Sequence, residues 1–136
     1  LLLIDFRLAY ATAEHPAEIM AKDPTLSGRR NQELRQRWDE FLSGPFKRYG
    51  SDQVEIEFQP TLDLSCAVPG SYGVDLRALV RSTEGTREFS AYYSRRYDAD
   101  HLAQALRREG WDPIERWTYG GDASPCVLML LRKASL

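Results

Sequence analysis

Polar and apolar residues alternate through the middle of the chain, over residues 72–97. Strand side chains point to opposite faces in turn, so this pattern predicts two long strands, joined at Glu84-Gly85. The first strand places its apolar residues on one face: Val74, Leu76, Ala78 and Val80. Its charged residues fall on the other face: Asp75, Arg77 and Arg81. The pattern therefore predicts a β-hairpin with one apolar face.

The second strand of this hairpin carries a polar row: Glu88, Ser90, Tyr92 and Ser94. Glu88 can bind an amine, imidazole or guanidinium through a charge-assisted hydrogen bond, and tyrosine offers a flat ring with a polar tip. We therefore predict that Glu88, Ser90, Tyr92 and Tyr93 bind a small cationic or amphipathic ligand. A polar cross-strand row on a solvent-exposed face is the alternative interpretation.

The remaining pattern predicts three helices and four further strands. The helices are expected over 16–22, over 27–41 and from Asp98 or Asp100 to Glu109, and the strands over 1–8, 54–58, 114–118 and 126–131. Breaks are expected at Gly44-Pro45 and at Pro60, since proline removes a backbone donor. Helices and strands are mixed along the chain, which indicates an α/β or an α+β fold.

The chain opens with a continuous apolar run, Leu1 to Ile4, followed by Asp5. Such a run is typical of a strand that is buried on both faces, as in a parallel sheet. Since termini usually lie at the surface, we expect the chain to be the later part of a larger domain. Asp5 lies near the carboxyl end of this strand, where open α/β sheets bind ligands; capping the next turn is an equal alternative.

Composition narrows the function classes. The chain has 136 residues and a net charge of −2, which indicates a single domain and argues against a general nucleic-acid binder. The apolar start is too short for a membrane span or a signal peptide. Cys66 and Cys126 lie far apart without a CxxC pattern, so we expect free thiols, no metal site and a cytoplasmic location.

Common catalytic and phosphate-binding motifs are absent from the sequence, among them GxGxxG, GxxxxGK[ST], HExxH and GxSxG. The two histidines, His15 and His101, fall in a turn and in the first turn of a helix. The carboxylates form no evident catalytic pair. The sequence therefore predicts a binding surface for a small molecule but does not identify catalytic residues.

The stretch from Phe89 to Lys133 resembles the C-terminal end of class I S-adenosylmethionine-dependent methyltransferases. The likeness lies in YSRRYDADHLAQALRREGW, IERW and CVLMLLRK. The opening LLLIDF is similar to the strand that follows the cofactor-binding half of that fold. The resemblance implies that residues 1–136 form the later half of a Rossmann-like α/β sheet with an antiparallel hairpin.

A more specific resemblance is to the histidine-specific methyltransferases of the ergothioneine type. Their substrate strand reads Glu-x-Ser-x-Lys-aromatic, and Glu88, Ser90 and Tyr93 match it, with Tyr92 in place of the lysine. Asn31 is similar to an asparagine on a helix of that family, while the family's upstream tyrosine has no counterpart. The glycine-rich cofactor loop and the acidic residue that ends the second strand are absent as well.

The resemblance implies methyl transfer from S-adenosylmethionine to a nitrogen or oxygen of a small amino-acid-like acceptor. This chain would supply the acceptor-binding part, and a missing N-terminal half would bind the cofactor. No nucleic-acid or membrane partner is expected. The alternative is a complete, non-catalytic α+β domain that binds a small ligand or forms a homodimer.

Overall fold

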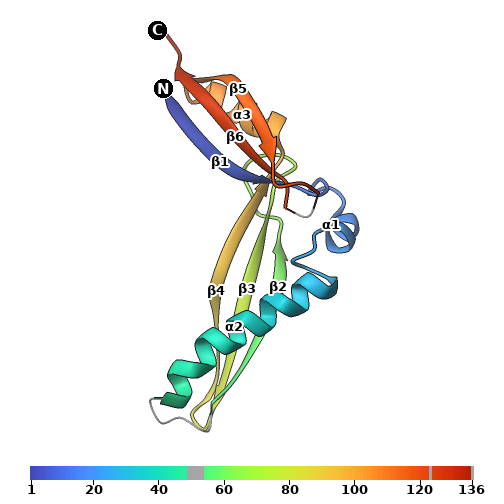
Figure 1. Ribbon diagram of the computed structural model, residues 1–136, viewed down its shortest axis with the longest axis vertical. Helices are drawn as coiled ribbons and strands as arrows, with labels where there is room; N and C mark the ends of the chain where they lie inside the picture. The colour runs from blue at the N-terminus through green and yellow to red at the C-terminus, as the bar shows by residue number, and fades with distance from the viewer. Residues whose placement is uncertain (49–53, 123, 136) are drawn as a thin grey trace. The chain divides into compact units, whose positions relative to one another are not determined.

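The computed structural model describes residues 1–48, 54–122 and 124–135 (Figure 1), with the backbone alone for 28–30 and 42–48. The elements follow one another as β1 (Leu2–Leu8), α1 (Pro16–Lys22), α2 (Gly28–Arg48), β2 (Glu55–Asp63), β3 (Tyr72–Ser82), β4 (Gly85–Tyr97), α3 (Ala99–Arg108), β5 (Trp111–Tyr119) and β6 (Cys126–Lys133). The predicted mixture of helices and strands is confirmed, and so is the hairpin over residues 72–97.

Two predicted breaks at prolines are wrong. Helix α2 continues through Pro45 to Arg48, and strand β2 continues through Pro60 to Asp63. β2 is the last strand on one side of the sheet, where a missing backbone donor is tolerated. A helix gains most of its stability from packing its apolar face, and this packing can outweigh one unfavourable residue.

The six strands are hydrogen-bonded in the order β2-β3-β4-β1-β6-β5. β1 pairs in parallel with β4 at Arg7 and Leu8, and β6 pairs antiparallel with both β1 and β5. The chain divides into two compact units, which we describe separately. Unit 1 consists of Leu1–Ile19, Leu64–Gly73 and Arg95–Leu136, and unit 2 of Met20–Asp63 and Val74–Ser94.

Unit 1 packs α3 on one face of the β1, β6 and β5 strands. Its buried core consists of Phe6, Ala103, Val127, Met129 and Leu131, and half-buried Ile4, Leu8, Leu102 and Leu106 pack around it. Asp98 caps α3, because its carboxylate accepts a hydrogen bond of 3.0 Å from the backbone N–H of His101. Gly110 ends the helix with a φ of +85°, as glycine allows.

The prediction of a strand buried on both faces at Leu1 to Ile4 is wrong. β1 does lie between β4 and β6, but Leu1, Leu2 and Leu3 are 88%, 39% and 55% exposed. The reason is that α3 packs on the face of Ile4 and Phe6, so Leu3 projects from the uncovered face. In addition, β6 pairs with β1 from Leu2 to Arg7, whereas pairing with β4 is confined to Arg7 and Leu8. Within the described residues, the apolar start of β1 therefore has a paired strand on one side.

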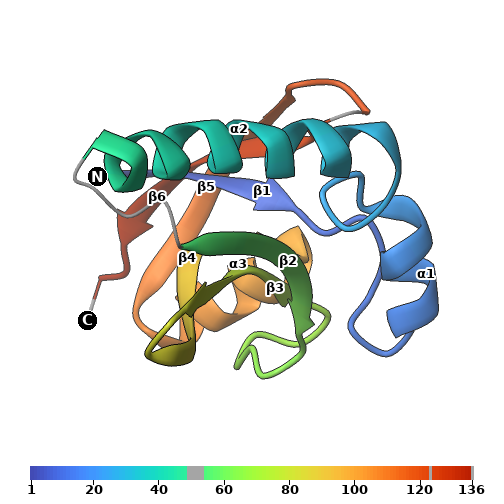
Figure 2. The same ribbon diagram turned by 90° about the horizontal axis from the view of Figure 1, so that it is seen from below.

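Unit 2 packs α2 across the apolar face of the β2, β3 and β4 strands, as Figures 1 and 2 show. Phe58, Leu76 and Ala78 form the buried cluster, and half-buried Trp38, Ile56 and Ala91 pack against it. Polar contacts hold the segment before α2 in place. The Asp23 carboxylate accepts hydrogen bonds from the Thr25 backbone and hydroxyl, and the Asn31 side chain donates one of 2.8 Å to the Thr25 carbonyl.

Candidate functional site

The polar side chains of unit 2 gather on the sheet face that points away from α2. Leu76 and Ala78 pack against the α2 side, so Asp75 and Arg77 project from the other face. Side-chain contacts pair Glu57 with Arg81 and Thr61 with Asp75. Because residue numbers rise along β2 as they fall along β3, the two strands are antiparallel. This arrangement brings polar residues of three strands together.

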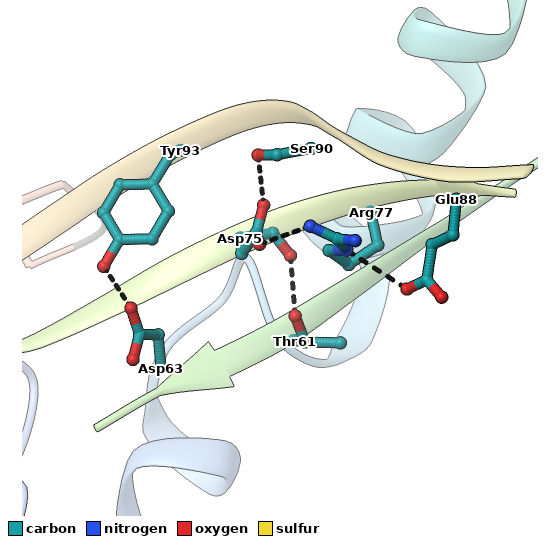
Figure 3. A network of polar contacts seen from close by, with 7 residues as sticks. All are labelled: Thr61, Asp63, Asp75, Arg77, Glu88, Ser90 and Tyr93. Carbon is teal, nitrogen blue, oxygen red and sulfur yellow. Dashed lines mark hydrogen bonds and ion pairs between the residues drawn. The ribbon is translucent and has the colours of Figure 1, made fainter. Parts of the chain in front are cut away.

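Asp75 is the centre of the resulting network (Figure 3). Its Oδ1 accepts a hydrogen bond of 2.5 Å from the Ser90 hydroxyl, and its Oδ2 accepts one of 3.3 Å from Nη1 of Arg77. Its backbone carbonyl accepts a hydrogen bond of 3.1 Å from the Thr61 hydroxyl. Asp75 therefore links β2, β3 and β4 through both its side chain and its backbone.

Arg77 connects this centre to Glu88. Its Nε donates a hydrogen bond of 3.1 Å to Oε1 of Glu88, so one guanidinium group is shared by two carboxylates. The hydrogen bond to Glu88 raises the pKa of Arg77 above its ordinary value, and the bond to Asp75 adds to this shift. Two predicted ligand-binding residues, Glu88 and Ser90, are thus joined through Arg77 and Asp75.

Tyr92 and Tyr93 each lie on the sheet face that strict alternation predicts for the other. The Tyr93 hydroxyl donates a hydrogen bond of 2.6 Å to Oδ2 of Asp63, beside the Asp75 network (Figure 3). The Tyr92 ring instead packs against Trp38 of α2, with ring centroids 5.8 Å apart. The prediction that Tyr92 shares a row with Glu88 and Ser90 is therefore wrong, because strict alternation does not hold between Ser90 and Tyr93.

The contacts from neighbouring strands were not predicted from the sequence. For Asp75 and Arg77 a signal was present, since a hairpin that turns at Glu84-Gly85 places their face beside that of Glu88 and Ser90. For Thr61 and Asp63 there was none. Their strand reaches β3 only after the loop over residues 64–71, and loop sequence does not fix strand register.

Around Arg77 the network has an excess of negative charge, because Asp75 and Glu88 share one guanidinium. The Asp63 carboxylate lies in the same network, where it accepts the hydrogen bond from Tyr93. The flanking pair, Glu57 and Arg81, lies 3.1 Å apart and balances its own charge. Hydrogen bonds from Gln59 and then from Arg81 lower the pKa of Glu57. The face formed by Asp63, Asp75, Arg77, Glu88, Ser90 and Tyr93, which we call the acidic network, therefore favours a cationic group.

Asp5 has a hydrogen-bond partner in unit 1. The Tyr119 hydroxyl donates a hydrogen bond of 2.6 Å to Oδ1 of Asp5. This bond to a carboxylate raises the pKa of Tyr119 to about 12, with smaller contributions from burial and from Cys126. Asp5 therefore binds a side chain of β5, and the structure does not give it the turn-capping contact that the sequence left open.

The other candidate residues, His15, His101, Cys66 and Cys126, belong to unit 1. His101 lies in unit 1, where its Nδ1 is 3.1 Å from Oδ1 of Asp98, and the His15 carbonyl accepts backbone bonds at the start of α1. Cys66 and Cys126 are half-buried free thiols, as predicted. In the described residues no group of three metal-ligating side chains occurs, and no helix is long and apolar enough to cross a membrane.

Three hollows open elsewhere on the two units. In unit 2, a groove of about 410 Å³ lies between α2 and β2, and Arg35, Asp39 and Glu57 are among the residues that line it. In unit 1, hollows of about 500 and 300 Å³ flank the 2.8 Å ion pair between Asp100 and Arg116. Glu88, Ser90, Tyr92 and Tyr93 line none of these three. Glu88, Ser90 and Tyr93 are exposed, so the acidic network is open to solvent.

Comparison of the chain with protein-family models, with curated proteins and with solved structures gave no match. The functional interpretation therefore depends on the residues and geometry described above.

Proposed function

We propose that this chain supplies the acceptor-binding part of an S-adenosylmethionine-dependent methyltransferase. Its acceptor is a small, amino-acid-like molecule that carries a cationic amine or imidazole, and the methyl group goes to a nitrogen or oxygen. The observation that carries the proposal is the acidic network. Glu88 and Ser90, the two residues of the Glu-x-Ser pattern, are held on one sheet face by Asp75 and Arg77.

The chemistry of the network supports a cationic acceptor. Carboxylates bind ammonium, imidazolium and guanidinium groups through charge-assisted hydrogen bonds, which are stronger than neutral ones. The Tyr93 ring and hydroxyl add an apolar surface with a polar tip beside these carboxylates. Such residues orient an acceptor, and orientation is a large part of catalysis in a transfer between two bound molecules.

The sheet topology is compatible with the later half of a Rossmann-like sheet. β1 and β4 form a parallel pair, and the last strand, β6, is inserted antiparallel between β1 and β5. The methyl donor does not fit the residues of this chain. The chain contains no GxGxxG pattern, so it lacks the glycine-rich turn that holds such a cofactor. The proposal therefore concerns the acceptor.

Replacing Glu88 with glutamine tests the proposal. We expect Glu88→Gln to weaken acceptor binding about two- to fivefold, the factor that one exposed ion pair contributes. Calorimetry with L-histidine on the purified protein measures this change. Glu84→Gln is the matched control, because Glu84 lies in the turn of the same hairpin, outside the network. An equal loss in Glu84→Gln, or no loss in Glu88→Gln, would contradict the assignment.

A non-catalytic ligand-binding or dimerisation domain is the second candidate. It is favoured by one observation: Glu88 and Ser90 each have a hydrogen-bond partner inside the protein. A network that serves stability alone would have this property. Unchanged L-histidine binding in Glu88→Gln would favour this candidate.

A further inference from the structure

The guanidinium of Arg77 lies between two carboxylates of the proposed acceptor site. Its Nε is 3.1 Å from Oε1 of Glu88, and its Nη1 is 3.3 Å from Oδ2 of Asp75. A bound acceptor that uses Glu88 would bring its own cation to the same carboxylate. Two cations cannot both make close contact with one carboxylate oxygen without repelling each other.

We infer that Arg77 is an internal counterion of the acceptor site, which the cationic group of the acceptor displaces from Glu88. This inference rests on the proposed function and extends it, because it assigns a specificity role to a residue outside the Glu-x-Ser pattern. Arg77 occupies the cation position in the absence of acceptor. An acceptor binds when its cation replaces the guanidinium.

Because the ion pair is exposed, replacing Arg77 with another cation costs little free energy. The side chains of Arg77 and Glu88 are 29% and 52% exposed, so solvent reaches the pair. An ion pair of this kind corresponds to a factor of only about two to five in an equilibrium constant. Arginine also has a long, flexible stem, which allows the guanidinium to move away while the stem stays packed.

The remaining contacts hold the site in place when Arg77 leaves. Ser90 donates to Oδ1 of Asp75 and Thr61 donates to its backbone carbonyl, and neither contact involves Arg77. Tyr93 is held separately by Asp63. Asp75 and Asp63 therefore keep their positions, and the acceptor meets a site that is partly organised in advance.

Displacement of Arg77 selects for charge. A cationic acceptor replaces the interaction that Glu88 loses, whereas a neutral acceptor leaves Glu88 without its counterion. Neutral molecules therefore bind less well than cationic ones of the same shape. The position of Arg77 thus provides discrimination that the carboxylates alone do not.

The test is to remove the internal counterion and measure the affinity of a cationic probe. We expect Arg77→Ala to bind L-histidine about two- to fivefold more tightly than the unmodified protein, by calorimetry at low salt. The gain should shrink at high salt, because screening weakens exposed ion pairs. Arg81→Ala is the matched control: it removes the same charge from the same strand face, but its ion-pair partner is Glu57. Its affinity should stay unchanged.

Two further variants distinguish the loss of the Arg77 charge from a disturbance of folding. Arg77→Gln removes the charge and keeps hydrogen-bond donors, so it should reproduce the gain even where alanine disturbs folding. Arg77→Lys keeps the charge and should bind like the unmodified protein. Equal or weaker binding in Arg77→Gln, with Glu88→Gln still weakened, would overturn the inference and leave the proposed function standing. Absence of binding in every variant and in the unmodified protein would overturn both.

Discussion

In each unit, one helix packs on one face of three strands. The units differ in the side chains on the opposite face, which the helix leaves uncovered. In unit 1, α3 packs on β1, β6 and β5, and in unit 2, α2 packs on β2, β3 and β4. The face of unit 2 away from its helix is the acidic network, in which hydrogen bonds and ion pairs join three strands (Figure 3).

The corresponding face of unit 1 mixes apolar and charged residues. Strand register places Asp5, Leu128 and Trp117 in one line across the three strands, and Leu3, Leu130 and Glu115 in the next line. The line on the other side holds Arg7, Cys126 and Tyr119. Leu3 and Trp117 are 55% and 43% exposed. A hydrogen bond crosses this face from Tyr119 to Asp5. Similar packing thus leaves a surface of linked polar side chains in unit 2 and a mixed, partly apolar surface in unit 1, so function depends on the side chains rather than on the architecture.

The largest effects should come from the two cores, and they test whether the units are independent. Leu76→Ala in unit 2 and Met129→Ala in unit 1 each remove a side chain that is 1% exposed. Each should lower the free energy of unfolding by about 2–5 kcal/mol, since it leaves a cavity. Hydrogen exchange should show the greatest loss of amide protection in the unit that carries the change.

An equal loss of amide protection in both units would show that the units are not independent. If Leu76→Ala lowered amide protection equally in α2 and in α3, the two units would unfold as one cooperative body. Phe41→Ala provides a control for the effect of substitution itself, because Phe41 is largely exposed and its removal should change stability little.

Sequence pattern predicted the helices and strands well because periodicity is a local property. The hairpin at 72–97 and the helix at 16–22 lie where the pattern placed them. The errors depend on neighbours that the pattern does not reveal. Pro60 remains in a strand because β2 lies at the edge of the sheet, and Leu3 is exposed because α3 covers only the other face of unit 1.

The candidate site was predicted in part for the same reason. Alternation placed Glu88 and Ser90 together, and the structure joins them through Asp75 and Arg77. It failed at Tyr92, whose ring packs against Trp38 of a helix more than fifty residues earlier in the chain. Contacts of that range depend on tertiary packing, which side-chain alternation along one strand does not determine.

A smaller effect on the free energy of unfolding should distinguish the uncovered face of unit 2 from that of unit 1. Asp75→Asn disturbs contacts to Ser90 and Arg77, so we expect it to lower the free energy of unfolding by about 1 kcal/mol. Asp5→Asn disturbs the bond to Tyr119 and should lower the free energy of unfolding less. Urea denaturation of both variants measures the difference. Equal losses, or a larger loss for Asp5→Asn, would show that the acidic network does not hold its strands together more firmly than the face of unit 1.

The smallest effect is a change in one ionisation, and it isolates the bond that crosses the face of unit 1. The hydrogen bond to Asp5 raises the pKa of Tyr119 to about 12, so the folded state retains this phenolic proton above the ordinary pKa of 10. The bond therefore stabilises the fold fully below pH 10, and this contribution is lost as the pH rises through 12. Ultraviolet absorbance should show a late-ionising tyrosine component that belongs to Tyr119. Asp5→Asn should bring that ionisation back toward 10, while Asp112→Asn, which removes a carboxylate from the other end of β5, should leave it in place. A late ionisation that persists in Asp5→Asn would mean that burial, rather than the bond to Asp5, controls Tyr119.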